Sequence, residues 1–259
     1  MSPQTILEEN RTYWTGRAPG YSAINRLELS TAQRRKWKDC LHAALSGRFP
    51  DRAPQDLRVL EAGTGPGFFA ILLCELGYGV TAVDLTPAML AEAKKNAGPL
   101  AGSIVWTEMN AEELAFADGS FDAVISRNLT WNLPHPDRAY AEWARVLKPG
   151  GLLLNFDANW YAYLFDRDAL AAYERDRLNS AGQGAGDQNV GENFGVMEDI
   201  ARRVPLSRIR RPEWDLEQLR RLGLEAEADT EVWRRVWSEE EKLNFASTPL
   251  FMITAKRRP

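Results

Sequence analysis

Between residues 57 and 157, short apolar segments alternate with longer segments in which apolar residues recur at helical spacing. The short segments have the length and composition of buried strands. We expect five of them, at residues 57–62, 80–83, 104–106, 121–126 and 152–156. Strands that alternate with helices in this way predict a parallel sheet with helices on both faces.

The longer segments supply the helices. Residues 68–76 predict an apolar helix, and a second helix reaches Lys95. That second helix begins with Thr86 as its N-cap and Pro87 at its first helical position, a typical start signal. Residues 135–147 have an amphipathic pattern and predict a third helix.

The two ends of the chain depart from this alternation. Residues 1–50 are helical in pattern and rich in aromatic side chains, which predicts a helical cap. Residues 158–215 predict an insertion after the fifth strand, with a helix over residues 168–179. The loop that we expect at residues 180–195 holds five glycines, and a loop this long is typical of a lid. Ligand should then protect it from proteolysis.

The end of the chain is expected to complete the sheet. A helix at residues 217–222 precedes two strand-like segments, at residues 224–232 and 249–256. The whole chain, residues 1–259, is therefore interpreted as one domain. Its expected parts are listed in chain order: a cap (1–50), a core (57–157), an insertion (158–215) and a closing segment (216–259).

Composition excludes several classes of protein. The chain has 259 residues, of which 44% are apolar and 26% are charged, as in ordinary globular proteins. The net charge is −4, and the arginine-rich end beyond Ala201 balances 13 basic against 10 acidic residues. Nucleic-acid binding usually needs a clustered positive excess, so we expect no such partner.

The cysteines and the N-terminus point to an intracellular enzyme. Cys40 and Cys74 are too few for a disulfide framework or a cysteine-rich metal site, and we expect Cys74 to be a buried apolar residue. Residues 1–14 lack the apolar core of a signal peptide, and no apolar stretch approaches the roughly 18 residues that span a bilayer. The expectation is a cytoplasmic protein with no membrane partner and no metal.

A glycine-rich segment follows the first expected strand. Residues 61–67 read EAGTGPG, with three glycines at alternate positions before a helix. Glycine permits a tight turn and a close approach of backbone to ligand, and the helix start offers unpaired N–H groups. The dinucleotide pattern G-x-G-x-x-G needs a small sixth residue, but Phe68 stands there. The spacing therefore disfavours a dinucleotide.

Asp84 ends the second expected strand, 21 residues after Gly63. A carboxylate there can accept hydrogen bonds from both hydroxyls of a ribose. All adenosyl cofactors carry this ribose, so the position does not separate them. The structural alternative is an acid that caps the next turn.

Three segments in order carry a family resemblance. Residues 60–90, 109–133 and 140–151 resemble the class I S-adenosylmethionine (SAM)-dependent methyltransferases, above all the ubiquinone/menaquinone-biosynthesis group. The resemblance covers about residues 57–157. It implies a Rossmann-like α/β fold with a seven-stranded, mostly parallel sheet whose last strand is antiparallel. It also implies SAM as the cofactor. The aromatic-rich cap and the insertion after the fifth strand suggest an enclosed pocket, and hence a small organic molecule as the methyl acceptor.

The resemblance assigns residues to the cofactor. An aromatic from the N-terminal helix is expected over it, and Asn110 stands where the family usually has Asp, so an acceptor oxygen is kept and a charge is lost. The residues implied are Tyr13, Tyr21, Glu61, Gly63, Thr64, Gly65, Gly67, Asp84, Leu85, Met89, Asn110, Ala111, Glu112, Arg127 and Asn128.

The acceptor side is less defined. Methyl transfer needs alignment of the two reactants more than acid–base catalysis, so a catalytic base is optional. The candidates for one are His135, Asp157 and Tyr161, and Trp131, Trp160 and Tyr161 are candidates for the pocket wall. Anchoring the insertion is an equally good interpretation for those near residue 157. His42 is expected to be structural.

Other functions remain open at this point. An aminopropyl transferase with the same sheet usually has paired acids after the fourth strand, and residues 126–131 have none. A dinucleotide-dependent reductase would need a Tyr-x-x-x-Lys pair, which is lacking. A SAM-fold enzyme that does not methylate, or a SAM-binding module without turnover, is the remaining alternative. The sequence does not define the oligomeric state.

Overall fold

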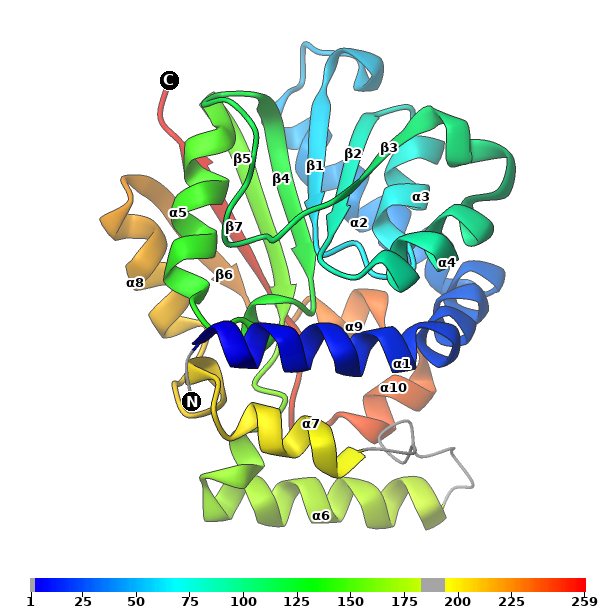
Figure 1. Ribbon diagram of the computed structural model, residues 1–259, viewed down its shortest axis with the longest axis vertical. Helices are drawn as coiled ribbons and strands as arrows, with labels where there is room; N and C mark the ends of the chain where they lie inside the picture. The colour runs from blue at the N-terminus through cyan, green and yellow to red at the C-terminus, as the bar shows by residue number, and fades with distance from the viewer. Residues whose placement is uncertain (1–2, 183–193) are drawn as a thin grey trace.

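The computed structural model describes residues 3–182 and 194–259, which are organised around one seven-stranded sheet (Figure 1). The strand order is β3-β2-β1-β4-β5-β7-β6; β1 to β5 are parallel, and β7 runs antiparallel to β5 and β6. The strands are β1 (Arg58–Ala62), β2 (Gly79–Asp84), β3 (Ile104–Glu108), β4 (Phe121–Arg127), β5 (Leu147–Asp157), β6 (Leu224–Asp229) and β7 (Phe251–Arg257). The expected fold class is confirmed.

Helices cover both faces of the sheet and its carboxyl edge. The α-helices are α1 (Pro3–Ser30), α2 (Gln33–Arg48), α3 (Phe68–Glu75), α4 (Pro87–Ala97), α5 (Pro136–Val146), α6 (Arg167–Gly182), α7 (Phe194–Ala201), α8 (Glu213–Arg221), α9 (Trp233–Val236) and α10 (Glu239–Asn244). Short 3-10 helices are η1 (Pro54–Asp56), η2 (Gly98–Ser103), η3 (Thr130–Asn132), η4 (Ala162–Leu164) and η5 (Pro205–Ser207). As expected, α4 begins at Pro87 with extended Thr86 before it.

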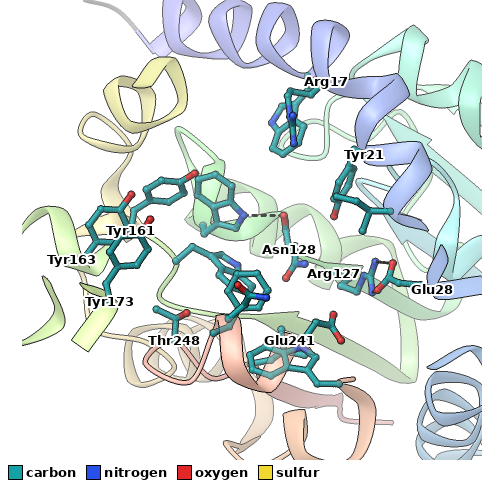
Figure 2. A pocket seen from close by; sticks show the side chains of 18 of the residues that line it. Arg17, Tyr21, Glu28, Arg127, Asn128, Tyr161, Tyr163, Tyr173, Glu241 and Thr248 are labelled. Carbon is teal, nitrogen blue, oxygen red and sulfur yellow. Dashed lines mark hydrogen bonds and ion pairs between the residues drawn. The ribbon is translucent and has the colours of Figure 1, made fainter. Parts of the chain in front are cut away.

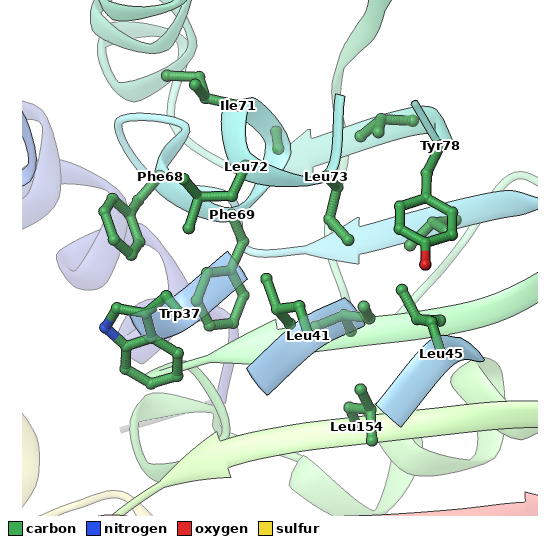
Figure 3. Packing of buried hydrophobic residues seen from close by; sticks show 14 of the residues in the cluster. Trp37, Leu41, Leu45, Phe68, Phe69, Ile71, Leu72, Leu73, Tyr78 and Leu154 are labelled. Carbon is green, nitrogen blue, oxygen red and sulfur yellow. The ribbon is translucent and has the colours of Figure 1, made fainter. Parts of the chain in front are cut away.

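The core forms two layers because the central strands are buried on both faces. One layer packs α2, α3 and α9 on the sheet around the Trp37 indole, which lies 5.0 Å from the Phe69 ring (Figure 3). The other layer packs α5 and α8 around the fully buried Trp143. Fully burying one large apolar side chain contributes about 1.5–3 kcal/mol, so these layers hold the strand ends in place.

The carboxyl edge of the sheet is enclosed by segments from outside the core. Helix α1 crosses this edge, and α6 and α7 lie beyond it (Figure 1). A small apolar cluster joins α1 to α7, and Ile6, Trp131 and Ile200 belong to it. Ligands of open α/β sheets bind at this edge, so the cap and the insertion form the roof of any site there.

Several boundaries differ from those expected from the sequence. Of the loop expected at residues 180–195, residues 180–182 belong to the end of α6 and residues 194–195 to the start of α7; residues 183–193 lie outside the described residues. Strand β6 ends at Asp229 rather than at residue 232, where the chain turns toward α9. Cys74 is only partly buried; it lies near the end of α3 and packs against the edge of the core. In the described residues, no helix has the length and apolar character needed to cross a membrane.

Candidate functional site

The glycine-rich segment forms a turn of bare backbone where β1 ends. The N–H groups of Gly63 and Thr64 both donate to the Val83 carbonyl oxygen at 2.9 Å, which ties the turn to β2. Gly63 has a φ of +70°, and a Cβ placed there would lie 2.6 Å from a Leu129 methyl carbon. A side chain would therefore be both strained and obstructed at this position.

Asp84 lies against this turn. Its Oδ2 accepts a 2.8 Å hydrogen bond from the Gly65 N–H, and its Oδ1 accepts one of 2.9 Å from the Thr86 N–H. Burial raises the pKa of Asp84, and these backbone hydrogen bonds oppose that rise. Each carboxylate oxygen has a second lone pair, so both can still accept a hydroxyl of a ligand.

A cleft opens beside the turn and Asp84. It is a cavity of about 110 Å³ between the sheet edge and α1. Twelve of the fifteen residues expected to hold the cofactor line it: Tyr21, Glu61, Gly63, Thr64, Gly65, Asp84, Leu85, Met89, Asn110, Ala111, Arg127 and Asn128. Residues that the sequence did not indicate also line it, including Asn10, Trp14 and Asn25 of α1.

The other three expected cofactor residues lie elsewhere. Tyr13 lines a different cavity, next to Trp14. Gly67 packs against α4, since an added Cβ would lie 2.9 Å from the Cβ of Ala93. The Glu112 carboxylate accepts a 2.7 Å hydrogen bond from the His135 N–H and is 5% exposed, so it braces two loops.

Glu61 is a buried acid at the base of the cleft. Its Oε2 accepts a 2.6 Å hydrogen bond from the Thr64 hydroxyl. Burial raises the pKa of Glu61 to about 8, although Thr64 and the Arg127 charge oppose the rise. Near neutral pH this side chain is therefore a neutral carboxylic acid in a large fraction of molecules.

A second cavity, of about 210 Å³, adjoins the cleft (Figure 2). Four residues line both spaces: Trp14, Tyr21, Arg127 and Asn128. Its walls are largely aromatic, and we call it the aromatic cavity. The three residues expected in the acceptor pocket, Trp131, Trp160 and Tyr161, all line it, and the Trp131 and Tyr161 rings lie 4.9 Å apart.

An ion pair stands at the junction of the two cavities. Arg127 makes two hydrogen bonds with Glu28, of 2.8 and 2.9 Å, and the two side chains are 11% and 9% exposed. The guanidinium also lies 4.4 Å from the centre of the Phe68 ring. A cation held by both a carboxylate and an aromatic face has little freedom to move, so Arg127 forms a fixed wall.

Only one of the three candidate catalytic residues lies at a cavity. Tyr161 lines the aromatic cavity, whereas His135 and Asp157 line neither cavity. His135 precedes α5. Asp157 is fully buried, and Arg211 donates to its Oδ2 at 2.8 Å.

Asp157 belongs to a buried network beneath the aromatic cavity. Arg211 also bonds Asp215 at 2.7 Å and the Thr130 hydroxyl at 2.6 Å. Tyr140 donates to Asp215 at 2.6 Å, and the Trp131 N–H donates to Asp157 at 2.9 Å. The network thereby fixes the wall residue Trp131 to the ends of β5 and α8.

Sequence reasoning missed the charged residues of the aromatic cavity. Glu28, Glu241 and Arg17 line it, and each lies in a helix; the capping box that Glu241 forms with Ser238 marks the start of α10 and not a site. Only the fold brings them together. In the described residues, no group of three or more His, Cys, Asp or Glu side chains could hold a metal ion.

Comparison with known proteins gives a family match for the core. Residues 60–155 match the model of the methyltransferase domain family. The ubiquinone/menaquinone biosynthesis C-methyltransferase of Methylobacterium nodulans is 38% identical over 138 residues, or 52% of this chain and 53% of that protein. The protein of that name from Nitrobacter hamburgensis is 38% identical over 142 residues, 53% of this chain and 54% of its own. The chain thus spans about half the length of these relatives.

Solved structures share the fold over more of the chain. A complex of the Haloferax volcanii Trm112 methyltransferase activator with a methyltransferase matches with a TM-score of 0.59 and 19% identity, over 94% of this chain and 97% of that one. Haemonchus contortus phosphoethanolamine N-methyltransferase 2 in complex with SAM matches with a TM-score of 0.54 and 19% identity, over 84% of this chain and 52% of that one.

Proposed function

Because this chain carries a class I methyltransferase domain, with the SAM-binding methyltransferase fold, we propose that it transfers the methyl group of SAM to a small organic molecule. SAM would occupy the cleft beside the glycine turn, and the acceptor would occupy the aromatic cavity. SAM supplies an activated methyl group on a positively charged sulfur. The protein supplies orientation and a dry site.

The observation that carries this proposal is the contact between Gly65 and Asp84. A hydrogen bond of 2.8 Å fixes the carboxylate at the mouth of a turn whose backbone is bare. Both groups line the cleft, with the Tyr21 ring beside Gly65, so a ribose in the cleft can approach both at once. Leu85 and Met89 line the same cleft and supply apolar surface for an adenine.

The shared boundary of the two cavities supports the second half of the proposal. Tyr21 and Asn128 line both spaces, so a molecule in one cavity faces a molecule in the other across these side chains. An in-line displacement needs this relation of donor to acceptor. A dinucleotide fits less well, because Phe68 is 2% exposed and packed against Trp37 where the third glycine of a dinucleotide turn would stand.

Calorimetric titration tests the proposal directly. SAM should bind the wild type, and NADH should not. In Asp84→Asn the charged acceptor becomes a neutral amide, so SAM affinity should fall by about tenfold or more, the loss expected for charge-assisted hydrogen bonds. Asp229→Asn, at the end of β6, removes an acid from a strand end outside the cleft and should bind SAM as the wild type does. Equal affinities for all three proteins, or no binding of SAM, would contradict the proposal.

A further inference from the structure

The aromatic cavity contains one carboxylate that no cation neutralises at close range. Glu241 lies in α10 and lines the cavity, on the side away from Arg17 (Figure 2). Its Oε2 accepts from the Ser238 N–H at 2.7 Å and from the Gln33 side chain. Within residues 3–182 and 194–259, no Lys or Arg forms an ion pair with it, because the nearby Arg127 is held by Glu28.

Aromatic rings line the same cavity as this carboxylate. The Phe245 ring lies 5.3 Å from the Trp160 ring and 5.8 Å from the Trp237 ring, and all three residues line the cavity. Phe245 follows Glu241 by four positions, so the two side chains leave the same side of the chain. Aromatic faces beside a carboxylate form a typical site for an organic ammonium group, which gains from the ring quadrupoles as well as from the charge.

A second acceptor stands at the junction with the cleft. The Asn128 side-chain oxygen is buried and has no hydrogen-bond partner among the described residues. The Asn128 backbone has a φ of +55°, in the left-handed region that costs energy for a residue with a side chain. This conformation holds the amide between the two cavities. A buried oxygen without a donor costs about 1–3 kcal/mol, which a ligand N–H group would recover.

We propose, on the basis of the function proposed above, that the methyl acceptor is a small organic amine whose nitrogen binds between the Glu241 carboxylate and the Asn128 side-chain oxygen. Arg17 and Arg127 do not oppose this placement. Arg127 is neutralised by Glu28, and Arg17 comes from α1 on the far side of the cavity (Figure 2). A phenol or hydroquinone would instead leave the Glu241 carboxylate without a donor of matching charge.

The chemistry balances with Glu241 as the proton acceptor. An ammonium group has no lone pair, so it first gives a proton to the Glu241 carboxylate. Burial raises the pKa of Glu241, the hydrogen bonds from Ser238 oppose the rise, and the charges of Glu28 and Arg127 act in opposite directions; the net rise makes this carboxylate a better base than an exposed one. The amine lone pair then forms a bond to the methyl carbon while the methyl–sulfur bond breaks, and that bonding pair stays on sulfur. Glu241 returns the proton to solvent.

Binding of matched amines and alcohols tests this inference without turnover. Benzylamine, phenethylamine and tryptamine are titrated into the wild-type protein saturated with S-adenosylhomocysteine, each beside the alcohol in which OH replaces NH₂. At least one amine should bind at least about tenfold more tightly than its alcohol, because only the amine brings a charge-assisted hydrogen bond. Equal binding within every pair, or no binding of any amine, would overturn the inference.

Two glutamate variants test whether the Glu241 charge causes the preference for the amine. Glu241→Gln keeps an oxygen for the Ser238 N–H and should remove the preference for the amine. Glu240→Gln removes the same charge from the exposed neighbouring position of α10 and should keep the preference. An unchanged preference in Glu241→Gln would contradict the role of Glu241. Titration of SAM separates the two proposals: SAM binding without amine selectivity defeats only this one, whereas no SAM binding defeats the proposed function.

Discussion

Replacement of Arg211 by methionine should destabilise the protein severely. The Arg211 side chain is fully buried, and it makes ion pairs with Asp157 at 2.8 Å and with Asp215 at 2.7 Å. Burial works against its charge, but these two carboxylates hold the pKa of Arg211 well above its usual value. Methionine fills a similar volume without charge or donors. The variant therefore leaves two buried carboxylates without their cation.

The loss of Arg211 affects the two carboxylates unequally. Asp157 keeps donors from the Thr130 hydroxyl and from the backbone N–H groups of Trp131 and Ala158, the last two at 2.9 Å. Asp215 keeps only the Tyr140 hydroxyl, at 2.6 Å, among the side-chain donors that the structure describes. Removing one partner of a buried ion pair costs about 3–5 kcal/mol, and most of this cost should come from Asp215.

Urea unfolding followed by tryptophan fluorescence measures the effect. We expect Arg211→Met to lose about 3–5 kcal/mol of unfolding free energy. The double variant Arg211→Met/Asp215→Asn should be more stable than Arg211→Met, because its second change removes the charge that has no cation. Arg210→Met, whose side chain is 89% exposed, should change stability by less than about 0.5 kcal/mol. A loss below about 1 kcal/mol in Arg211→Met would refute the reasoning from buried charge.

Two further predictions concern the glycine turn and its buried acid. Gly67→Ala should cost more unfolding free energy than Gly223→Ala in the same urea assay, by about 1 kcal/mol or more, because the two positions have similar positive φ, of +89° and +82°, but only at Gly67 would the Cβ meet another side chain; equal losses would contradict this. Burial raises the pKa of Glu61 to about 8, above the unfolded value near 4.5. The difference in unfolding free energy between the wild type and Glu61→Gln should therefore be largest below pH 4.5 and should fall as the pH rises through 8. A pH-independent difference between the two proteins would exclude it.

The cleft could be predicted from the sequence because its groups follow strands directly. Gly63, Gly65 and Asp84 lie within a few residues of the ends of β1 and β2, and parallel neighbours bring those ends together. The family resemblance assigned Asn110 and Asn128 to the same site, and both line the cleft. Gly67 faces α4 and not the cleft. The motif predicted that a glycine is needed there, but not that Ala93 of α4 is the neighbour that requires it.

The charged lining of the aromatic cavity could not be predicted in this way. Glu241 contacts Gln33, which lies 208 positions earlier, and Arg127 contacts Glu28, which lies 99 positions earlier. Neither pair has a spacing or a local pattern that marks it. Such contacts depend on how the cap, the insertion and the closing segment pack on the sheet, and their sequences read as ordinary helices.

Similarity to known methyltransferases covers the cleft but little of the aromatic cavity, so it says little about the acceptor. The matched segment, residues 60–155, supplies the turn, Asp84 and most of the cleft in which we propose that SAM binds. Apart from Arg127, Asn128 and Trp131, the aromatic cavity is lined by residues outside that segment. A common core can therefore hold one methyl donor while different caps select different acceptors. The acceptor that we propose has to be sought from the chemistry of the cap, the insertion and the closing segment, and Glu241 lies in the closing segment.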